Sequence, residues 1–304
     1  MSTTAGRRSQ WGPLRIADAH VHFFSHQFFL KLVAQKPGLT LESAQALLSW
    51  ELPEPDPERL AARWIAELDQ HGVNGSAMIA SIPGDEGSVT VAARAHPDRL
   101  FAYAMVNPKQ AFTGETFSDI RVACLFPAMH GYSIHDECTR PVFEWAQRER
   151  RCVFVHCGVL SVGVRKKLGL PSPFDMRFSN PIDLHAMAMH YPGVPIIVPH
   201  FGAGYFREAL MLADLCPNVY FDTSSSNDWT KYQTPVVELR DIFKQALDVL
   251  GPSRLLFGTD SSFFPRGWNQ AIFEAQATAL YELGVGNHDA RAIFGENLLR
   301  ILAR

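Results

Sequence analysis

Two histidines spaced by one residue follow the first apolar run of the chain, in the sequence IADAHVH of residues 16–22. In an extended strand, side chains at positions i and i+2 point to the same face. His20 and His22 therefore project side by side and can bind one metal ion through their ring nitrogens. A His-x-His pair alone is a weak signal, because most histidines are polar groups with a local partner.

Three further residues share this placement directly after an apolar run, namely His156, His200 and Asp260. The apolar runs have the length of strands, and the carboxyl ends of parallel strands meet at one edge of a sheet or barrel. Histidine nitrogens and one carboxylate oxygen suit Zn²⁺, and they also accept Mn²⁺ or Fe²⁺. The recurrence therefore predicts a metal enzyme rather than a set of unrelated histidines.

Apolar runs alternate with amphipathic segments along the whole chain. The predicted strands are Leu14–Ala19, Ser76–Ser81, Leu100–Val106, Ile120–Phe126, Cys152–His156, Pro195–Pro199, Val219–Asp222 and Arg254–Gly258. The predicted helices between them are Pro57–His71, Gly87–His96, Arg140–Arg150, Pro181–Tyr191, Tyr205–Leu215, Thr234–Leu250 and Asn269–Leu283. Eight strand–helix units favour a closed (β/α)₈ barrel of the TIM type. The alternative is an open, doubly wound sheet, and the absence of Gly-x-Gly-x-x-Gly after the first strand counts against its dinucleotide-binding form.

The 304 residues fit one barrel domain spanning residues 1–304. Residues 23–55 interrupt the rhythm directly after the histidine pair and are expected to form an insertion beside the site. Residues 158–180 form a second long segment, which carries Arg165, Lys166, Lys167 and Arg177. Long loops inside compact domains are usually functional or disordered.

Composition excludes several classes of function. The formal net charge is -3, with no basic stripe, which counts against nucleic acid or a membrane surface as partner. No apolar run approaches the ~20 residues of a membrane span. The five cysteines show no paired spacing, and the polar residues 1–10 carry no signal-peptide pattern. We therefore expect a cytoplasmic protein that acts on a small-molecule substrate.

The motifs at the strand ends resemble those of a known family. They are DAHVH at 18–22, VHCG at 155–158, PHFG at 199–202, FGTD at 257–260 and IFGENL at 293–298. Together they resemble the amidohydrolase-2 group, the branch of the amidohydrolase superfamily that includes aminocarboxymuconate-semialdehyde decarboxylase. The resemblance covers nearly the whole chain, and it is specific for family and fold but not for substrate.

The resemblance implies a role for each matching residue. His20, His22 and His156 would hold the metal by nitrogen, and Asp260 would bind the metal or its water and shuttle a proton. His200 would contact the water or the substrate from the second shell of the metal. A metal lowers the pKa of bound water from near 16 to roughly 7, which leaves Asp260 and His200 to take and return protons.

The resemblance also implies one metal ion, with zinc the first expectation. Two-metal members of the superfamily carry a carboxylated lysine or a glutamate at the end of strand four. Here that strand reads RVACLFP at residues 121–127, with neither. Family resemblance further suggests a homo-oligomer, a dimer or larger.

Two residues are candidates for substrate contact. Arg266 follows Asp260 by six residues and could clamp a substrate carboxylate with two parallel hydrogen bonds, although a surface arginine paired to a loop is the alternative. His130 lies in the loop after strand four, which would face the catalytic end of the barrel, and a simple loop histidine is equally consistent. Arg165 and Arg177 are weaker candidates.

The leading functional hypothesis is hydrolysis of a C–O or C–N bond in a small, carboxylate-bearing substrate through a metal-activated water. The alternative is non-oxidative decarboxylation of a cyclic or unsaturated carboxylic acid, which would use nearly the same residues. A third hypothesis is a metal-free barrel that binds a ligand or a partner. That hypothesis requires the histidines and the aspartate to have lost their metal-binding role. All the residue types that a metal site needs are present in this sequence.

Overall fold

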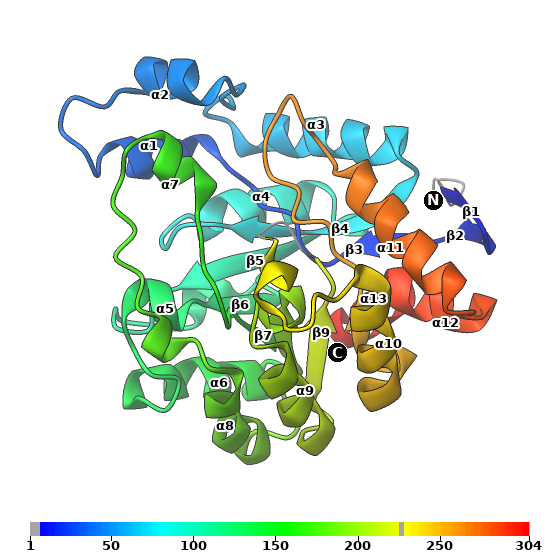
Figure 1. Ribbon diagram of the computed structural model, residues 1–304. Coiled ribbons are helices and arrows are strands. Elements are labelled where there is room, and N and C mark those ends of the chain that lie inside the picture. Colours follow the sequence, from blue (N-terminus) through cyan, green and yellow to red (C-terminus); the bar gives the residue numbers. More distant parts are fainter. Residues whose placement is uncertain (1–6, 225–227, 304) are drawn as a thin grey trace.

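In the computed structural model, which describes residues 7–224 and 228–303, a parallel sheet of eight strands curves into a barrel (Figure 1). Each strand pairs with the next along the chain. The strands are β3 (Ile16–Asp18), β4 (Val73–Ala80), β5 (Leu100–Val106), β6 (Val122–Leu125), β7 (Cys152–Val155), β8 (Ile196–Pro199), β9 (Val219–Asp222) and β10 (Leu255–Leu256). All eight predicted strands coincide with them, which confirms the barrel prediction.

Backbone hydrogen bonds join the last strand to the first. The amide of Ala19 donates to the carbonyl of Phe257 at 2.7 Å, and the amide of Asp260 donates to the carbonyl of His20 at 2.9 Å. Val21 and Ser261 form a further parallel bridge. The sheet therefore closes at its carboxyl edge, which excludes the open, doubly wound alternative and brings two predicted ligands together.

Alternate residues of each strand belong to two different apolar layers. Inside the barrel, Tyr103, Cys124 and Phe154 belong to one buried cluster. Their neighbours, such as Ala104 and Leu125, belong to the cluster between the strands and the helices. Because both faces are buried, the strands read as continuous apolar runs, which made them easy to predict.

Helices cover the outside of the barrel and bury one face each. They are α3 (Pro57–Gln70), α4 (Glu86–Ala95), α5 (Pro127–His130), α6 (Arg140–Arg148), α8 (His185–His190), α9 (Phe206–Leu215), α10 (Leu239–Leu250) and α11 (Gln270–Glu282). Short turns of 3₁₀ helix are η1 (Glu115–Phe117), η2 (Glu137–Thr139), η3 (Met176–Phe178), η4 (Pro181–Leu184), η5 (His200–Gly202), η6 (Trp229–Tyr232) and η7 (Pro252–Arg254). No helix within residues 7–224 and 228–303 is long and apolar enough to cross a membrane.

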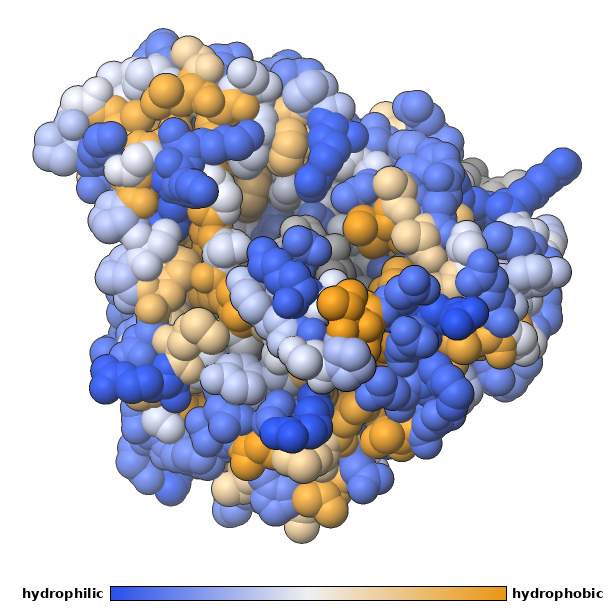
Figure 2. All heavy atoms as spheres, viewed as in Figure 1, coloured by the Kyte–Doolittle hydropathy of each residue, from blue (hydrophilic) through white to orange (hydrophobic). Residues whose placement is uncertain are grey.

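Three helices from the two long segments form a separate apolar cluster at the carboxyl end of the barrel. They are α1 (His26–Val33), α2 (Leu41–Leu48) and α7 (Gly163–Lys167), and we call them the cap. The cluster comprises Phe28, Phe29, Leu32, Ala44, Leu48, Trp50, Val164, Leu168 and Leu170. Figure 1 shows the three helices together at one end of the molecule. Figure 2 shows the surface hollowed beside them.

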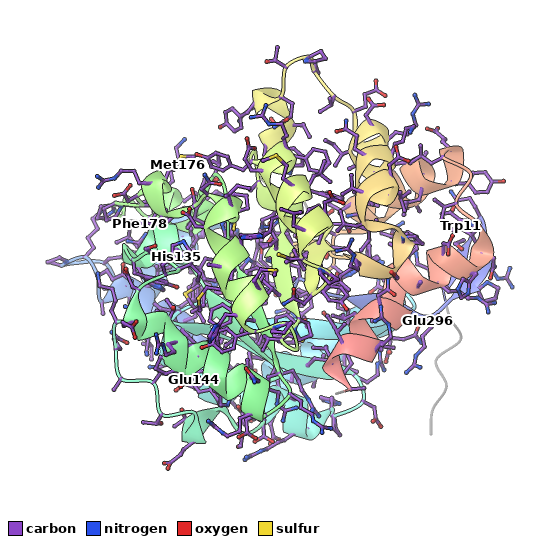
Figure 3. All side chains as sticks on the ribbon, turned by 90° about the horizontal axis from the view of Figure 1, so that it is seen from below. Trp11, His135, Glu144, Met176, Phe178 and Glu296 are labelled. Atoms are coloured by element: carbon purple, nitrogen blue, oxygen red, sulfur yellow. The ribbon has the colours of Figure 1, made fainter. Side chains whose placement is uncertain are left out.

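The C-terminal segment closes the opposite end of the barrel. It consists of α12 (Asn287–Arg291), the π-helical turn η8 (Ala292–Glu296) and α13 (Asn297–Leu302), and Leu298 and Ile301 join the interior cluster. Trp11 follows strand β1 (Arg7–Ser9) and precedes β2 (Gly12–Leu14). Its ring lies 5.8 Å from that of Phe294, on the side where Figure 3 labels Trp11 and Glu296. The N-terminal hairpin β1–β2 therefore packs against the C-terminal segment.

Candidate metal centre

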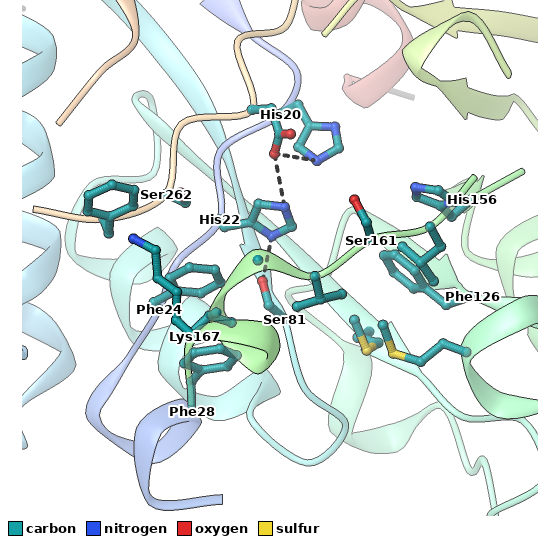
Figure 4. A pocket seen from close by; sticks show the side chains of 18 of the residues that line it. His20, His22, Phe24, Phe28, Ser81, Phe126, His156, Ser161, Lys167 and Ser262 are labelled. Carbon is teal, nitrogen blue, oxygen red and sulfur yellow. Dashed lines mark hydrogen bonds and ion pairs between the residues drawn. The ribbon is translucent and has the colours of Figure 1, made fainter. Parts of the chain in front are cut away.

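Three of the predicted ligands meet at the carboxyl end of the barrel. One ligand atom from each of His20, His22 and Asp260 lies within 4.8 Å of the other two. Oδ1 of Asp260 lies 3.1 Å from Nε2 of His22 and 3.6 Å from Nε2 of His20, as the dashed lines of Figure 4 show. Two imidazoles and one carboxylate that converge in this way can hold a divalent metal ion.

Asp222, at the end of β9, fixes the orientation of His20. Its Oδ2 lies 2.5 Å from Nδ1 of His20, and the hydroxyl of Ser224 lies 3.1 Å from the same nitrogen. Nδ1 therefore donates to the carboxylate, and Nε2 faces Asp260, where a metal ion can displace its proton. Burial alone would lower the pKa of His20, but the charges of Asp222, Asp260 and Asp18 outweigh it and raise the pKa to about 9.

Ser81 fixes the second histidine from the end of β4. Its hydroxyl lies 2.6 Å from Nδ1 of His22 and also donates to the carbonyl of Ile79 at 3.0 Å. This contact turns Nε2 of His22 toward Asp260, 3.1 Å from its Oδ1. Burial lowers the pKa of His22.

Asp260 occupies a left-handed backbone conformation, with φ of 56°. Such a conformation costs about 1–3 kcal/mol outside glycine and is concentrated at functional sites. Burial favours the neutral acid, yet the hydrogen bond from His22 and the charge of His20 hold the pKa of Asp260 well below its usual range. The carboxylate is therefore charged at neutral pH and available as a ligand.

His156 lies beside this group rather than within it. Its ring stacks on Phe126, with centroids 5.5 Å apart, and lies 5.3 Å from the ring of His200. Among the described residues, its buried Nδ1 has no hydrogen-bond partner. Burial lowers the pKa of His156 well below its usual value, so the ring is neutral and one of its nitrogens can bind a metal ion. Its role as a third histidine ligand stays a prediction.

His200 sits on a left-handed turn after β8. Positive φ angles of 56°, 53° and 44° occur at His200, Phe201 and Ala203. Nδ1 of His200 donates to the carbonyl of Ser224 at 2.9 Å, so Nε2 is the ring nitrogen without a proton. The ring lies 4.9 Å from that of His20, and burial lowers its pKa. His200 can therefore accept a proton beside the three ligands.

A pocket of about 390 Å³ opens above the ligands. Its lining is His20, His22, Phe24, Phe28, Trp50, Ser81, Met105, Phe126, Met129, His156, Leu160, Ser161, Val162, Gly163, Val164, Lys167, His200, Asp260, Ser262, Phe263 and Arg266. Figure 4 shows Phe24, Phe28 and Phe126 among the side chains that surround it. Among the described residues of this lining, and apart from the histidines, Asp260 is the only acidic side chain, and Lys167 and Arg266 are the only basic ones. The outer pocket is therefore positive.

The two cations flank a pair of stacked rings. Trp50, which follows α2 and belongs to the apolar cluster of the cap, stacks on Phe263, with centroids 4.1 Å apart. The Lys167 ammonium lies 5.6 Å from the Trp50 ring, and the Arg266 guanidinium lies 4.6 Å from the Phe263 ring. Arg266 also donates to the carbonyl of Asp260 at 3.2 Å and to the hydroxyl of Ser262 at 2.9 Å. Of the two residues predicted to contact the substrate, Arg266 lines the pocket. His130, at the end of α5, does not.

Sequence reasoning missed two buried carboxylates that support the site. Asp222 holds His20, as described above. Asp18 accepts hydrogen bonds from the amide of His20 at 2.9 Å and from the indole of Trp268 at 2.8 Å. Burial raises the pKa of Asp18 to about 6, against the hydrogen bonds that lower it. The available signal was a charged residue at the end of an otherwise apolar strand.

The barrel with a histidine and aspartate cluster at the carboxyl ends of its strands defines the class of protein. The family model described as amidohydrolase matches residues 17–304. The chain belongs to the amidohydrolase family and is an enzyme of the amidohydrolase superfamily, which comprises hydrolases and carboxy-lyases.

Solved structures show the same fold at low identity. A probable 2-pyrone-4,6-dicarboxylic acid hydrolase of Acinetobacter baumannii, with citric acid bound, is 14% identical with a TM-score of 0.61, covering 96% of this chain and 100% of its own. A dihydroxybenzoic acid decarboxylase of Polaromonas sp. JS666, with bound manganese and the inhibitor 2-nitroresorcinol, is 14% identical with a TM-score of 0.61, covering 95% of this chain and 97% of its own.

One curated relative matches part of the chain. It is the protein fluG of Emericella nidulans (strain FGSC A4), which is 33% identical over 87 residues, or 29% of this chain. The match spans 10% of the length of that relative.

Proposed function

We propose that the protein is a metal-dependent hydrolase that cleaves a C–O or C–N bond of a small, carboxylate-bearing substrate. The observation that carries the proposal is the ligand set of His20, His22 and Asp260 at the floor of the pocket. Nε2 of His20, Nε2 of His22 and the Asp260 carboxylate would hold one divalent ion, with His156 as a further nitrogen donor. Nitrogen-rich ligands favour zinc, and manganese or iron is the alternative.

A divalent ion in this position supplies Lewis-acid chemistry, polarising a carbonyl and lowering the pKa of water. The protein supplies the proton transfers. Asp260, charged at neutral pH, accepts the proton of the attacking water and returns it to the leaving group. His200, with an unprotonated Nε2, orients the substrate or the water from the other side of the pocket.

Lys167 and Arg266 support an anionic substrate. Both line the pocket and are exposed, and among residues 7–224 and 228–303 neither forms an ion pair. A substrate carboxylate at the outer pocket would receive charge-assisted hydrogen bonds from both. The rings of Phe24, Phe28 and Phe126 provide flat apolar walls for the remainder of the substrate.

Decarboxylation is the second candidate, and the aromatic lining is the observation that favours it. Flat rings on several sides of the pocket suit a cyclic or aromatic acid, whose carboxylate would lie at the metal and whose ring carbon would receive the proton. Asp260 and His200 are the bases that would take that proton from a water molecule and pass it to the ring carbon.

The test is a set of lactones, amides and aromatic acids, assayed with the metal-loaded protein for acid release and for CO₂. Hydrolysis without CO₂ supports the first proposal, and CO₂ release supports the second. Lys167→Gln and Arg266→Gln should each raise KM about tenfold for a carboxylate substrate and leave its uncharged methyl ester unaffected. Lys166→Gln, an exposed neighbour outside the pocket lining, is the control. Absence of both activities from every compound with fully metal-loaded protein would contradict the proposal.

We also propose a homo-oligomer, as the family resemblance suggests, and a cytoplasmic location. None of the five cysteines, all of which lie in the described part of the chain, forms a disulfide, which supports a reducing compartment.

A further inference from the structure

Two arginines lie side by side at the end of the barrel opposite the metal centre. Arg121 directly precedes β6 and Arg151 directly precedes β7. The register pairs Val122 with Cys152, and the amide of Cys152 donates to the carbonyl of Arg121 at 3.1 Å. Arg121 and Arg151 are therefore lateral neighbours on adjacent parallel strands. Like charges in such positions repel each other and destabilise a sheet.

Both arginines line one cavity of about 160 Å³ together with Arg94. The acidic residue in its lining is Asp119. Oδ2 of Asp119 accepts from Nε of Arg94 at 3.0 Å and from Nη2 at 2.5 Å, so its charge is already balanced by Arg94. The cavity thus carries two guanidinium charges in excess.

In the described part of the chain, no carboxylate forms an ion pair with Arg121 or Arg151. Within residues 7–224 and 228–303, Arg121 makes no side-chain hydrogen bond or ion pair, and the nearby Glu149 is paired with Arg148 at 2.9 Å. Nη2 of Arg151 donates to the carbonyl of Ser118 at 3.3 Å, whereas its buried Nε finds no acceptor there. A buried donor without an acceptor costs free energy that a ligand oxygen would recover.

The electrostatics agree with the geometry. Burial and then the positive charge of Arg121 lower the pKa of Arg151, and the smaller effects of Glu149 and Asp119 do not cancel them. Arg151 is thus held in a position that disfavours its own charge. An anion in the cavity would offset the repulsion and supply the missing acceptor.

We propose that this cavity is a binding site for a phosphate group, held between Arg121 and Arg151 with Arg94 at its edge. Guanidinium groups present paired donors that match the oxygens of phosphate. Two adjacent guanidinium groups suit the tetrahedral phosphate dianion better than a planar carboxylate with one charge. The cavity of about 160 Å³ has room for one phosphate group. The ligand is either inorganic phosphate or the phosphate of a small phosphorylated metabolite, and the site is separate from the substrate pocket.

The test is the melting temperature of the metal-loaded protein titrated with inorganic phosphate or with glycerol 1-phosphate at constant ionic strength. We expect the wild-type Tm to rise by about 5 °C at saturation. Arg121→Gln and Arg151→Gln should lose that rise. Without phosphate, Arg121→Gln should melt at the same temperature as the wild type or higher, because the repulsion is removed; a merely structural arginine would give a lower Tm.

Three comparisons make the result specific. Arg140→Gln, an exposed arginine on α6 outside the cavity, should keep the full rise, as should His22→Ala, in which phosphate can no longer act through the metal centre. A larger rise with glycerol 1-phosphate than with phosphate would identify a metabolite as the ligand, and equal rises would identify free phosphate. A wild-type Tm that responds to neither compound, or a full rise in Arg121→Gln, would overturn the proposal.

Discussion

At the scale of single residues, each histidine of the ligand cluster is held through one ring nitrogen so that the other faces the pocket. Asp222 holds His20, and Ser81 holds His22. The histidines could be predicted because each follows an apolar run. Their partners could not, since a serine or an aspartate after a strand is common and its contact crosses 59 or 202 positions of the chain.

Asp222→Asn tests this support. The amide cannot accept the proton of His20 Nδ1 as a carboxylate does, so the ring is less basic and less well oriented. We expect the dissociation constant for zinc to rise 10- to 100-fold, measured by competition with a chromogenic chelator. Asp248→Asn, which alters an exposed pair with Lys244 on α10, should leave zinc affinity unchanged. Equal affinity in Asp222→Asn and wild type would show that Asp222 does not position the ligand.

His130 gives a prediction about pH and stability. Burial and then the nearby Lys109 lower its pKa from 6.5 to about 4 in the folded protein. Between these values the unfolded chain binds a proton that the folded chain does not, so stability is lost as the pH falls from about 6.5 toward 4. In His130→Gln, the loss of unfolding free energy between pH 7 and pH 5 should be smaller by about 2 kcal/mol.

Urea unfolding at the two pH values measures the difference. The exposed His135→Gln is the matched control and should show the same loss as the wild type. An undiminished loss in His130→Gln would mean that the half-buried ring is protonated in the folded protein.

At the scale of elements, the loop after β7, which follows His156, packs against the turn after β8, which carries His200. Gly158, two residues after His156, has φ of 75° and packs against the backbone carbonyls of Gly202 and Ala203 in the left-handed turn. The amide of Val159 donates to the carbonyl of Ala203 at 2.8 Å. The position of His200 therefore depends on the segment that follows β7.

Gly158→Ala should disturb both loops. Its Cβ would overlap the two carbonyl oxygens, and alanine is strained at this φ. We expect a loss of at least about 2 kcal/mol in unfolding free energy, together with a fall in kcat. Gly163→Ala, in the same segment with open space around its Cβ, should change stability by less than about 0.5 kcal/mol. Wild-type stability in Gly158→Ala would show that the loops can separate freely.

The strands were predictable from the sequence, but the cap was not. Residues 158–180 read as a loop because α7 spans only five residues and shows no helical period of its own. Its Val164 is buried in a cluster with residues of α1 and α2, which lie more than 100 positions earlier. The helix predicted at Thr234 begins instead at Leu239, where Glu238 and Asp241 form a capping box.

At the scale of the whole molecule, the two ends of the barrel have different chemistry. The carboxyl end holds the ligand cluster under the cap, and the opposite end is closed by α13 and bears the arginine cavity. Motifs at the strand ends were sufficient to predict the family and the fold, because the barrel brings those ends together. The arginine cavity carries no motif, since it depends on the register between β6 and β7.

Metal content tests the central claim most directly. Protein purified without added metal should contain about one zinc or manganese per chain by elemental analysis. His22→Ala should retain almost none, whereas His185→Ala, an exposed histidine on α8, should match the wild type. Loss of metal in His156→Ala as well would make His156 a ligand. Full metal content in His22→Ala, or no metal in the wild type even after reconstitution, would contradict the account.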